Sequence, residues 1–155
     1  MPYFAAVFAQ TEQGWIAAEA DLAEAANLDD VSDLMREAAV EAIGDPVLLL
    51  VEEDDEWFAV VRLDGEGDPR VFISDSRAVL TSTLAALLHE HIGAVAAVSD
   101  GEPSGDPDLL EDLGTEAERL VELSDRTLPS DALSAVAERA GFGEEYDCLR
   151  LPSSP

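Results

Sequence analysis

The chain has 155 residues, of which 35 are acidic and 8 basic, so its formal net charge is −27. Such a charge repels nucleic acid and anionic membranes, and it attracts basic protein surfaces or cations. All basic residues are arginine, which excludes Schiff-base chemistry and a phosphate-binding lysine. The acidity has two explanations, an electrostatic binding role or a compositional bias, and both stay open.

The cysteine count and the N-terminus indicate a cytoplasmic protein. Cys148 is the single cysteine, so a disulfide framework and a thiolate zinc site are excluded. The N-terminus carries no basic region, and the longest apolar run is far shorter than the ~20 residues that span a bilayer. We therefore expect no membrane segment.

The first half of the chain begins with two predicted strands, Tyr3–Ala9 and Gly14–Ala20, which a polar connection of hairpin size joins. Apolar residues then recur at spacings of three and four over Leu28–Ile43. Asn27 precedes this series and Gly44 follows it, which are a start and a stop signal for a helix. The spacing therefore predicts an amphipathic helix.

Three further strands are predicted after this helix. Val47–Val51 is an apolar run short enough to be a strand covered on both faces. Trp57–Leu63 is rich in aromatic and β-branched residues, and Arg70–Ser74 follows a turn of glycines and aspartates. We expect the first two of these strands to pair as a hairpin.

A second helix is predicted with a buried stripe from Val79 to Leu88, and Ser74 or Asp75 is its candidate cap. The element order over residues 1–98 is thus β-β-α-β-β-β-α. This order predicts an α+β domain with one antiparallel sheet of about five strands packed against helices. It is similar to the order in roadblock and profilin-like folds.

The remaining residues predict a loop and a helical tail. Residues 99–108 are acidic and rich in glycine and proline, so we expect a hinge there. Residues 109–155 contain two short predicted helices, Glu116–Leu123 and Ser130–Ala140, and Gly141 is the stop signal of the second. Whether this tail packs on the sheet or swings free is open.

The most specific feature of the sequence is Val47–Phe58, an apolar run followed by five acidic residues and two aromatic ones, together with Asp68–Asp75. Weaker signals are Tyr3–Val7, Trp15 and Ala137–Tyr146. These segments resemble the actinobacterial family of tRNA adenosine deaminase-associated proteins. The family name reflects a gene beside that of the tRNA-editing deaminase, and the resemblance implies no catalytic residue or cofactor.

The sequence lacks the residues that a tRNA adenosine deaminase needs, so we expect that the chain is not itself such an enzyme. Those enzymes hold zinc with His and Cys ligands and carry H-x-E and P-C-x-x-C motifs, none of which is present. The only histidines are His89 and His91, which on a helix point about 200° apart and cannot converge on one ion. They fit a polar helix end better. With no nucleophilic triad or phosphate loop either, we predict no enzymatic activity and no cofactor.

One loop matches the calcium-binding pattern of EF-hands and is a weak metal candidate. Positions 1, 3, 5, 6, 7, 9 and 12 of that pattern are Asp100, Glu102, Ser104, Gly105, Asp106, Asp108 and Glu111. A glutamate in third position and two prolines oppose calcium binding, so we predict no metal site.

The densest acidic run is the candidate partner-binding segment, made of Glu52, Glu53, Asp54, Asp55 and Glu56. It is either a docking site for a basic partner or a solvated turn. We predict a non-catalytic accessory protein that docks on a basic protein surface, with the tRNA adenosine deaminase as the candidate, and modulates or masks it. The alternatives are a roadblock-like scaffold that forms a homodimer, and a carboxylate-based enzyme or ligand carrier with an unrecognised pocket.

Overall fold

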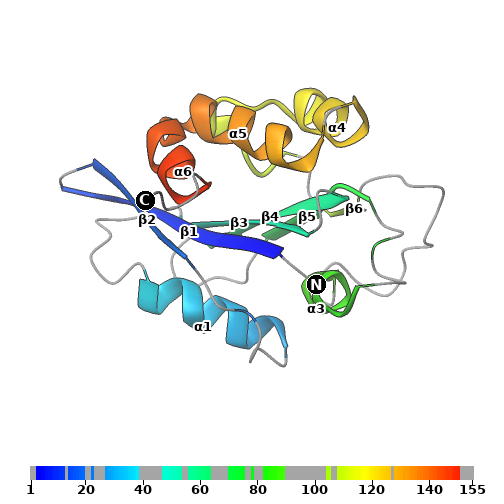
Figure 1. The fold of residues 1–155 in the computed structure, drawn as a ribbon, viewed down its shortest axis with the longest axis horizontal. Helices are drawn as coiled ribbons and strands as arrows, with labels where there is room; N and C mark the ends of the chain where they lie inside the picture. The colour runs from blue at the N-terminus through cyan, green and yellow to red at the C-terminus, as the bar shows by residue number, and fades with distance from the viewer. Residues whose placement is uncertain are drawn as a thin grey trace, which may run out of the picture.

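The computed structural model describes residues 3–12, 14–19, 22, 27–38, 47–53, 56–63, 70–75, 78, 82–89, 104–105, 108–126 and 128–150. Its strands form one antiparallel sheet in the order β2-β1-β3-β4-β5-β6, with helices on both faces (Figure 1). The strands are β1 Tyr3–Thr11, β2 Gly14–Glu19, β3 Val47–Glu53, β4 Trp57–Leu63, β5 Arg70–Ile73 and β6 Ser104–Gly105. The predicted α+β class and element order are confirmed, and the similarity to roadblock and profilin-like folds remains one of element order.

Among the described elements, two helices cover one face of the sheet and three cover the other (Figure 1). On the first face lie α1 Leu28–Ala38 and α3 Thr83–His89. On the second lie α4 Ala117–Arg126, α5 Pro129–Ala140 and α6 Gly143–Arg150, preceded by the 3-10 turn η2 Glu111–Leu113. No described helix is long and apolar enough to cross a membrane.

β1 lies between β2 and β3 and is antiparallel to both. β2 and β3 are therefore parallel to each other, and α1 connects them across the face of β1. At the β1–β2 turn Gly14 has a φ of 112°, a backbone conformation that residues with a side chain rarely adopt. The Thr11 hydroxyl closes this turn by donating to the Gly14 carbonyl at 2.9 Å.

The predicted start of α1 is confirmed, because the Asn27 side-chain oxygen accepts a hydrogen bond from the Asp30 N–H at 3.0 Å. The predicted cap of the second helix at Ser74 or Asp75 stays a prediction, because residues 76, 77 and 79–81 lie outside the described part. The Ser82 hydroxyl accepts from the Ala85 N–H at 3.1 Å and so caps α3, whereas the Ser74 hydroxyl accepts from the Phe58 N–H of β4. The predicted helix end at residues 39–44 lies outside the described residues.

Alternating side chains of the strands build two separate cores. Leu49, Val51 and Trp57 face α1 and α3, while Leu48 and Phe58 face α4 to α6. Every residue of β4 is buried, and only the last residue of β3 is not. The prediction that Val47–Val51 is covered on both faces is therefore confirmed.

The open question about the tail is decided, because α4, α5 and α6 share the second core with the sheet. α5 has Pro129 at its first position and ends at Gly141, whose φ is 102°, as the start and stop signals predicted. Three described elements were not predicted. They are the turn η2, the helix α6, and β6, which pairs with β5 inside the segment expected to be a loop. The division at residues 98 and 108 stays a prediction, because residues 90–103 lie outside the described part.

Candidate functional site

The acidic run after the central strand is not a uniformly solvated turn. Glu52 still belongs to β3 and is 7% exposed, on the face covered by α5 and α6, with Phe4 and Phe58 as its cross-strand neighbours. Glu53 is half-buried on the opposite face. Glu56 is exposed, and its N–H donates to the Glu53 carbonyl at 3.0 Å. Asp54 and Asp55 lie outside the described residues.

The Glu53 carboxylate joins three elements through one oxygen. It accepts hydrogen bonds from the Trp57 indole N–H at 3.2 Å and from the Ser82 hydroxyl at 2.6 Å. Trp57 opens β4 and Ser82 caps α3, so this carboxylate holds the β3–β4 hairpin against the helix. Glu53 therefore stabilises the base of the hairpin, Glu52 is buried within it, and Glu56 is exposed beyond them.

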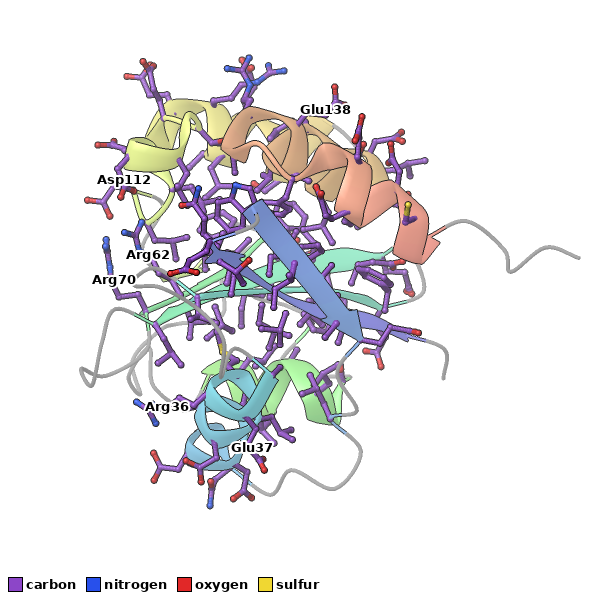
Figure 2. The ribbon with its side chains drawn as sticks, turned by 90° about the vertical axis from the view of Figure 1, so that its left-hand side faces the viewer. Arg36, Glu37, Arg62, Arg70, Asp112 and Glu138 are labelled. Atoms are coloured by element: carbon purple, nitrogen blue, oxygen red, sulfur yellow. The ribbon has the colours of Figure 1, made fainter. Side chains whose placement is uncertain are left out.

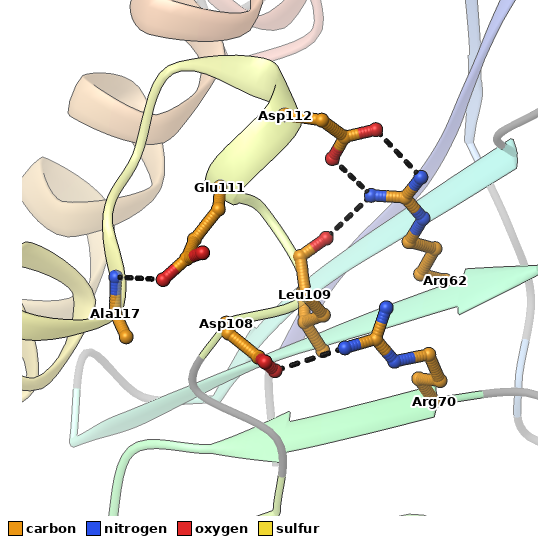
Figure 3. A network of polar contacts seen from close by, with 7 residues as sticks. All are labelled: Arg62, Arg70, Asp108, Leu109, Glu111, Asp112 and Ala117. Atoms are coloured by element: carbon orange, nitrogen blue, oxygen red, sulfur yellow. Dashed lines mark hydrogen bonds and ion pairs between the residues drawn. The ribbon is translucent and has the colours of Figure 1, made fainter.

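A second polar network was not singled out from the sequence, and it joins the sheet to the segment before α4 (Figure 3). The Arg62 guanidinium donates to both carboxylate oxygens of Asp112, at 2.6 and 2.9 Å, and to the Leu109 carbonyl at 2.6 Å. Its neighbour Arg70 donates to the Asp108 carboxylate at 2.9 Å. The available signal was an arginine within the otherwise apolar strand β4.

Burial makes the two partners of this ion pair unequal. The Arg62 side chain is 9% exposed, whereas the Asp112 side chain is 59% exposed. The hydrogen bonds from Arg62 lower the pKa of Asp112, and they outweigh the opposing effect of partial desolvation. A bidentate pair of this geometry anchors the η2 segment on β4.

The described members of the calcium-loop pattern do not point to a common centre. Ser104 lies in β6 and pairs with Ile73, Asp108 binds Arg70, and the Glu111 carboxylate accepts from the Ala117 N–H at 3.4 Å. Asp100, Glu102 and Asp106 lie outside the described residues, as do Glu90 and His91. Among the residues that the structure describes, no three His, Cys, Asp or Glu side chains form a group that could hold a metal ion.

An aromatic cluster attaches α6 to the β1–β2 hairpin. Phe142 stacks on Phe8 with ring centroids 4.3 Å apart and packs against Trp15 at 4.8 Å. Tyr146 meets Phe4 edge-on at 5.5 Å, and its hydroxyl donates to the Ser130 carbonyl in α5. Phe8, Phe142 and Tyr146 belong to the second core, and Phe4 and Trp15 are partly buried against it.

Exposed carboxylates line the outer side of the second helical layer (Figure 2). In the described part from residue 108 to 148, the exposed basic side chains are Arg119 and Arg139. The exposed acidic ones are Asp108, Glu111, Asp112, Glu116, Glu118, Glu122, Asp131, Glu138, Glu144 and Asp147. This layer is therefore a strongly negative surface supported by a rigid core.

The model of the family described as Rv3753c-like tRNA adenosine deaminase-associated protein matches residues 3–143. No curated protein and no solved structure matches the chain significantly. The matched range includes every strand and extends from β1 to the aromatic cluster at the start of α6.

Proposed function

The chain belongs to the Rv3753c-like tRNA adenosine deaminase-associated protein family, and we propose that it is a non-catalytic accessory protein that binds the tRNA adenosine deaminase. The family match carries this proposal. The net charge of −27 indicates how binding occurs, since a protein that binds tRNA needs a basic surface for the phosphates. The acidic chain docks on that basic surface, and such a partner implies a cytoplasmic location.

The proposed contact is the tip of the β3–β4 hairpin, within the acidic run Glu52–Glu56. Glu56 is exposed there, while the buried Glu52 and the hydrogen-bonded Glu53 keep the hairpin base rigid. A hairpin with a fixed base loses little conformational entropy at that base when a partner binds. The acidic layer of α4 to α6 adds long-range attraction, which raises the association rate more than the final affinity.

Occupation of the basic surface by carboxylates excludes tRNA from it. The chain then masks the editing enzyme or tunes its activity, depending on how tightly the two proteins bind. Because the attraction is between exposed charges, it is screened by salt over a distance of about 10 Å at ~0.1 M.

Isothermal titration calorimetry with the purified deaminase at low salt tests the proposal. We expect association in the micromolar range or tighter, weakening as salt is added. Neutralising the tip with Asp54→Asn, Asp55→Asn and Glu56→Gln weakens binding. The matched control is Asp29→Asn, Asp33→Asn and Glu37→Gln, which removes the same charge from α1 and leaves the hairpin tip unchanged. Absence of binding at micromolar concentrations discards this partner, and equal effects of both triple variants discard the hairpin tip as the contact.

A further inference from the structure

β2 forms one edge of the sheet, and among the described residues no strand pairs with its outer side. The β1–β2 hairpin projects beyond the helical layers at the left of Figure 1. An edge strand presents a row of backbone N–H and C=O groups that can pair with another chain. At the other edge of the sheet, β6 has only 2 residues, whereas β2 has 6. The longer binding edge is therefore that of β2.

β2 lacks the features that usually prevent edge pairing. Its first five residues, Gly14 to Ala18, include no charged residue and no proline. Charges, prolines and bulges are the common devices by which proteins block an edge. The pairing of β2 with β1 is regular over six consecutive residue pairs, from Thr11 with Gly14 to Ala6 with Glu19.

The strand is also held in place from one side. Trp15 packs against Phe142, directly before α6, and Phe142 in turn stacks on Phe8 of β1. A further strand would therefore add to an edge that is already ordered, and only the added segment would lose conformational entropy.

The charges around this edge indicate what binds there. Glu12, in the turn that precedes β2, and Glu19, the last residue of β2, are both exposed. At ~3.4 Å per residue the 6-residue strand is about 17 Å long, which a seven-residue extended segment spans. A second copy of this chain would bring another −27 charges to the same edge, whereas a segment with basic ends would pair with both glutamates.

We propose that the outer edge of β2 binds an extended segment of a partner protein with basic residues at both ends, adding it as a strand to the sheet. The inference deepens the proposed function by naming a second binding surface, and it rests on that function only for the expectation of a basic partner. Main-chain hydrogen bonds give the affinity, and the two terminal glutamates select the charge.

The test uses the full chain and a capped peptide of seven residues, with arginine at both ends and alternating valine and threonine between. Amide hydrogen exchange followed by NMR should show that the peptide protects backbone amides of β2 and leaves those of α4 unchanged. A second peptide carries N-methyl groups on alternate amides, which removes its hydrogen-bonding edge but keeps its charge. We expect it to give no protection.

Two charge variants separate local recognition from overall attraction. Glu12→Gln with Glu19→Gln should weaken binding of the first peptide roughly two- to tenfold, because each exposed ion pair contributes up to about a factor of five. The matched control, Glu118→Gln with Glu144→Gln on the helical layer, removes the same charge and should change binding less. Equal binding of both peptides, or no protection of β2, overturns the inference. Protection of β2 that rises with chain concentration in the absence of peptide also overturns it, in favour of a second copy.

Failure of this inference is distinguishable from failure of the proposed function. The peptide assay contains no deaminase, so its outcome does not depend on that partner. If the deaminase binds and the Glu12 and Glu19 variant binds it equally well, the function stands and the β2 edge is not its surface. If the peptide protects β2 but the deaminase does not bind, the edge serves another basic partner.

Discussion

Arg62 and Arg70 lie directly opposite each other on β4 and β5, and each reaches a different aspartate of the segment that leads into α4. Like charges opposite each other on one face destabilise a sheet. Asp112 and Asp108 offset this repulsion and at the same time fasten residues 108–112 to the sheet. In a chain of net charge −27, two of the few cations thus have a structural role.

The Asp112 carboxylate should stabilise the fold in a pH-dependent way. Since Arg62 lowers its pKa in the folded chain, its stabilising effect is complete above its ordinary value of 3.8 and is lost as the pH falls through the lowered value. We expect Asp112→Asn to reduce the free energy of unfolding by about 1 kcal/mol at neutral pH, a small value because the carboxylate is largely exposed. Urea unfolding across a pH series measures it. The difference from the unmodified chain should disappear in acid, and Glu37→Gln controls for the loss of one negative charge.

The aromatic cluster should make α6 essential for stability. Phe142→Ala removes a fully buried ring that stacks on Phe8, and we expect a loss of about 3–5 kcal/mol in the free energy of unfolding. Trp15 packs on the same ring, so its fluorescence should change as well. The control is Leu128→Ala at a 57% exposed position, with an expected change within about 0.5 kcal/mol. A loss below about 1 kcal/mol for Phe142→Ala would show that α6 does not pack on the sheet.

Ser82 should contribute to the stability of the fold through two hydrogen bonds. Its hydroxyl caps α3 and donates to Glu53, so Ser82→Ala removes both interactions. We expect a loss of about 1–2 kcal/mol in thermal or urea unfolding. Ser124→Ala is the matched control, because that hydroxyl donates to the Val121 carbonyl at an exposed place within α4. Equal effects of the two changes would refute the role of Ser82.

Added salt should stabilise the chain. The uncompensated negative charges repel one another in the compact state. The distance over which this repulsion acts falls from about 30 Å at ~0.01 M salt to about 10 Å at ~0.1 M. We expect the melting temperature to rise between these two salt concentrations. Differential scanning calorimetry checks this, and a melting temperature that falls with salt would mean that ion pairs such as Arg62 with Asp112 outweigh the repulsion.

The strands were predictable because their side chains carry the pattern of their environment. Val47–Val51 is apolar throughout because both faces are covered, and Trp57–Leu63 has the aromatic and β-branched residues of a strand. Gly141 predicted the end of α5 for an equally local reason, since the backbone there adopts a positive φ, which glycine favours.

Other features depend on partners distant in the sequence. Arg62 and Asp112 are separated by 50 positions, so no local pattern pairs them. Glu52 looked like the start of a charged turn because five acidic residues follow one another, yet the ladder with β1 and β4 continues through Glu53. α6 has few apolar residues, and Tyr146 becomes a core residue only by meeting Phe4 and Phe8. The short β6 likewise exists only through its pairing with β5.

The central strand β3 lies between the two helical layers and contacts both. Leu48 meets the side of α5, and the next residue, Leu49, meets the side of α1. The two hydrophobic cores are thus separated by a single layer of strand backbone. Because α5 and α1 pack on opposite sides of the same peptide units, a substitution that displaces one helix should also disturb the packing of the other.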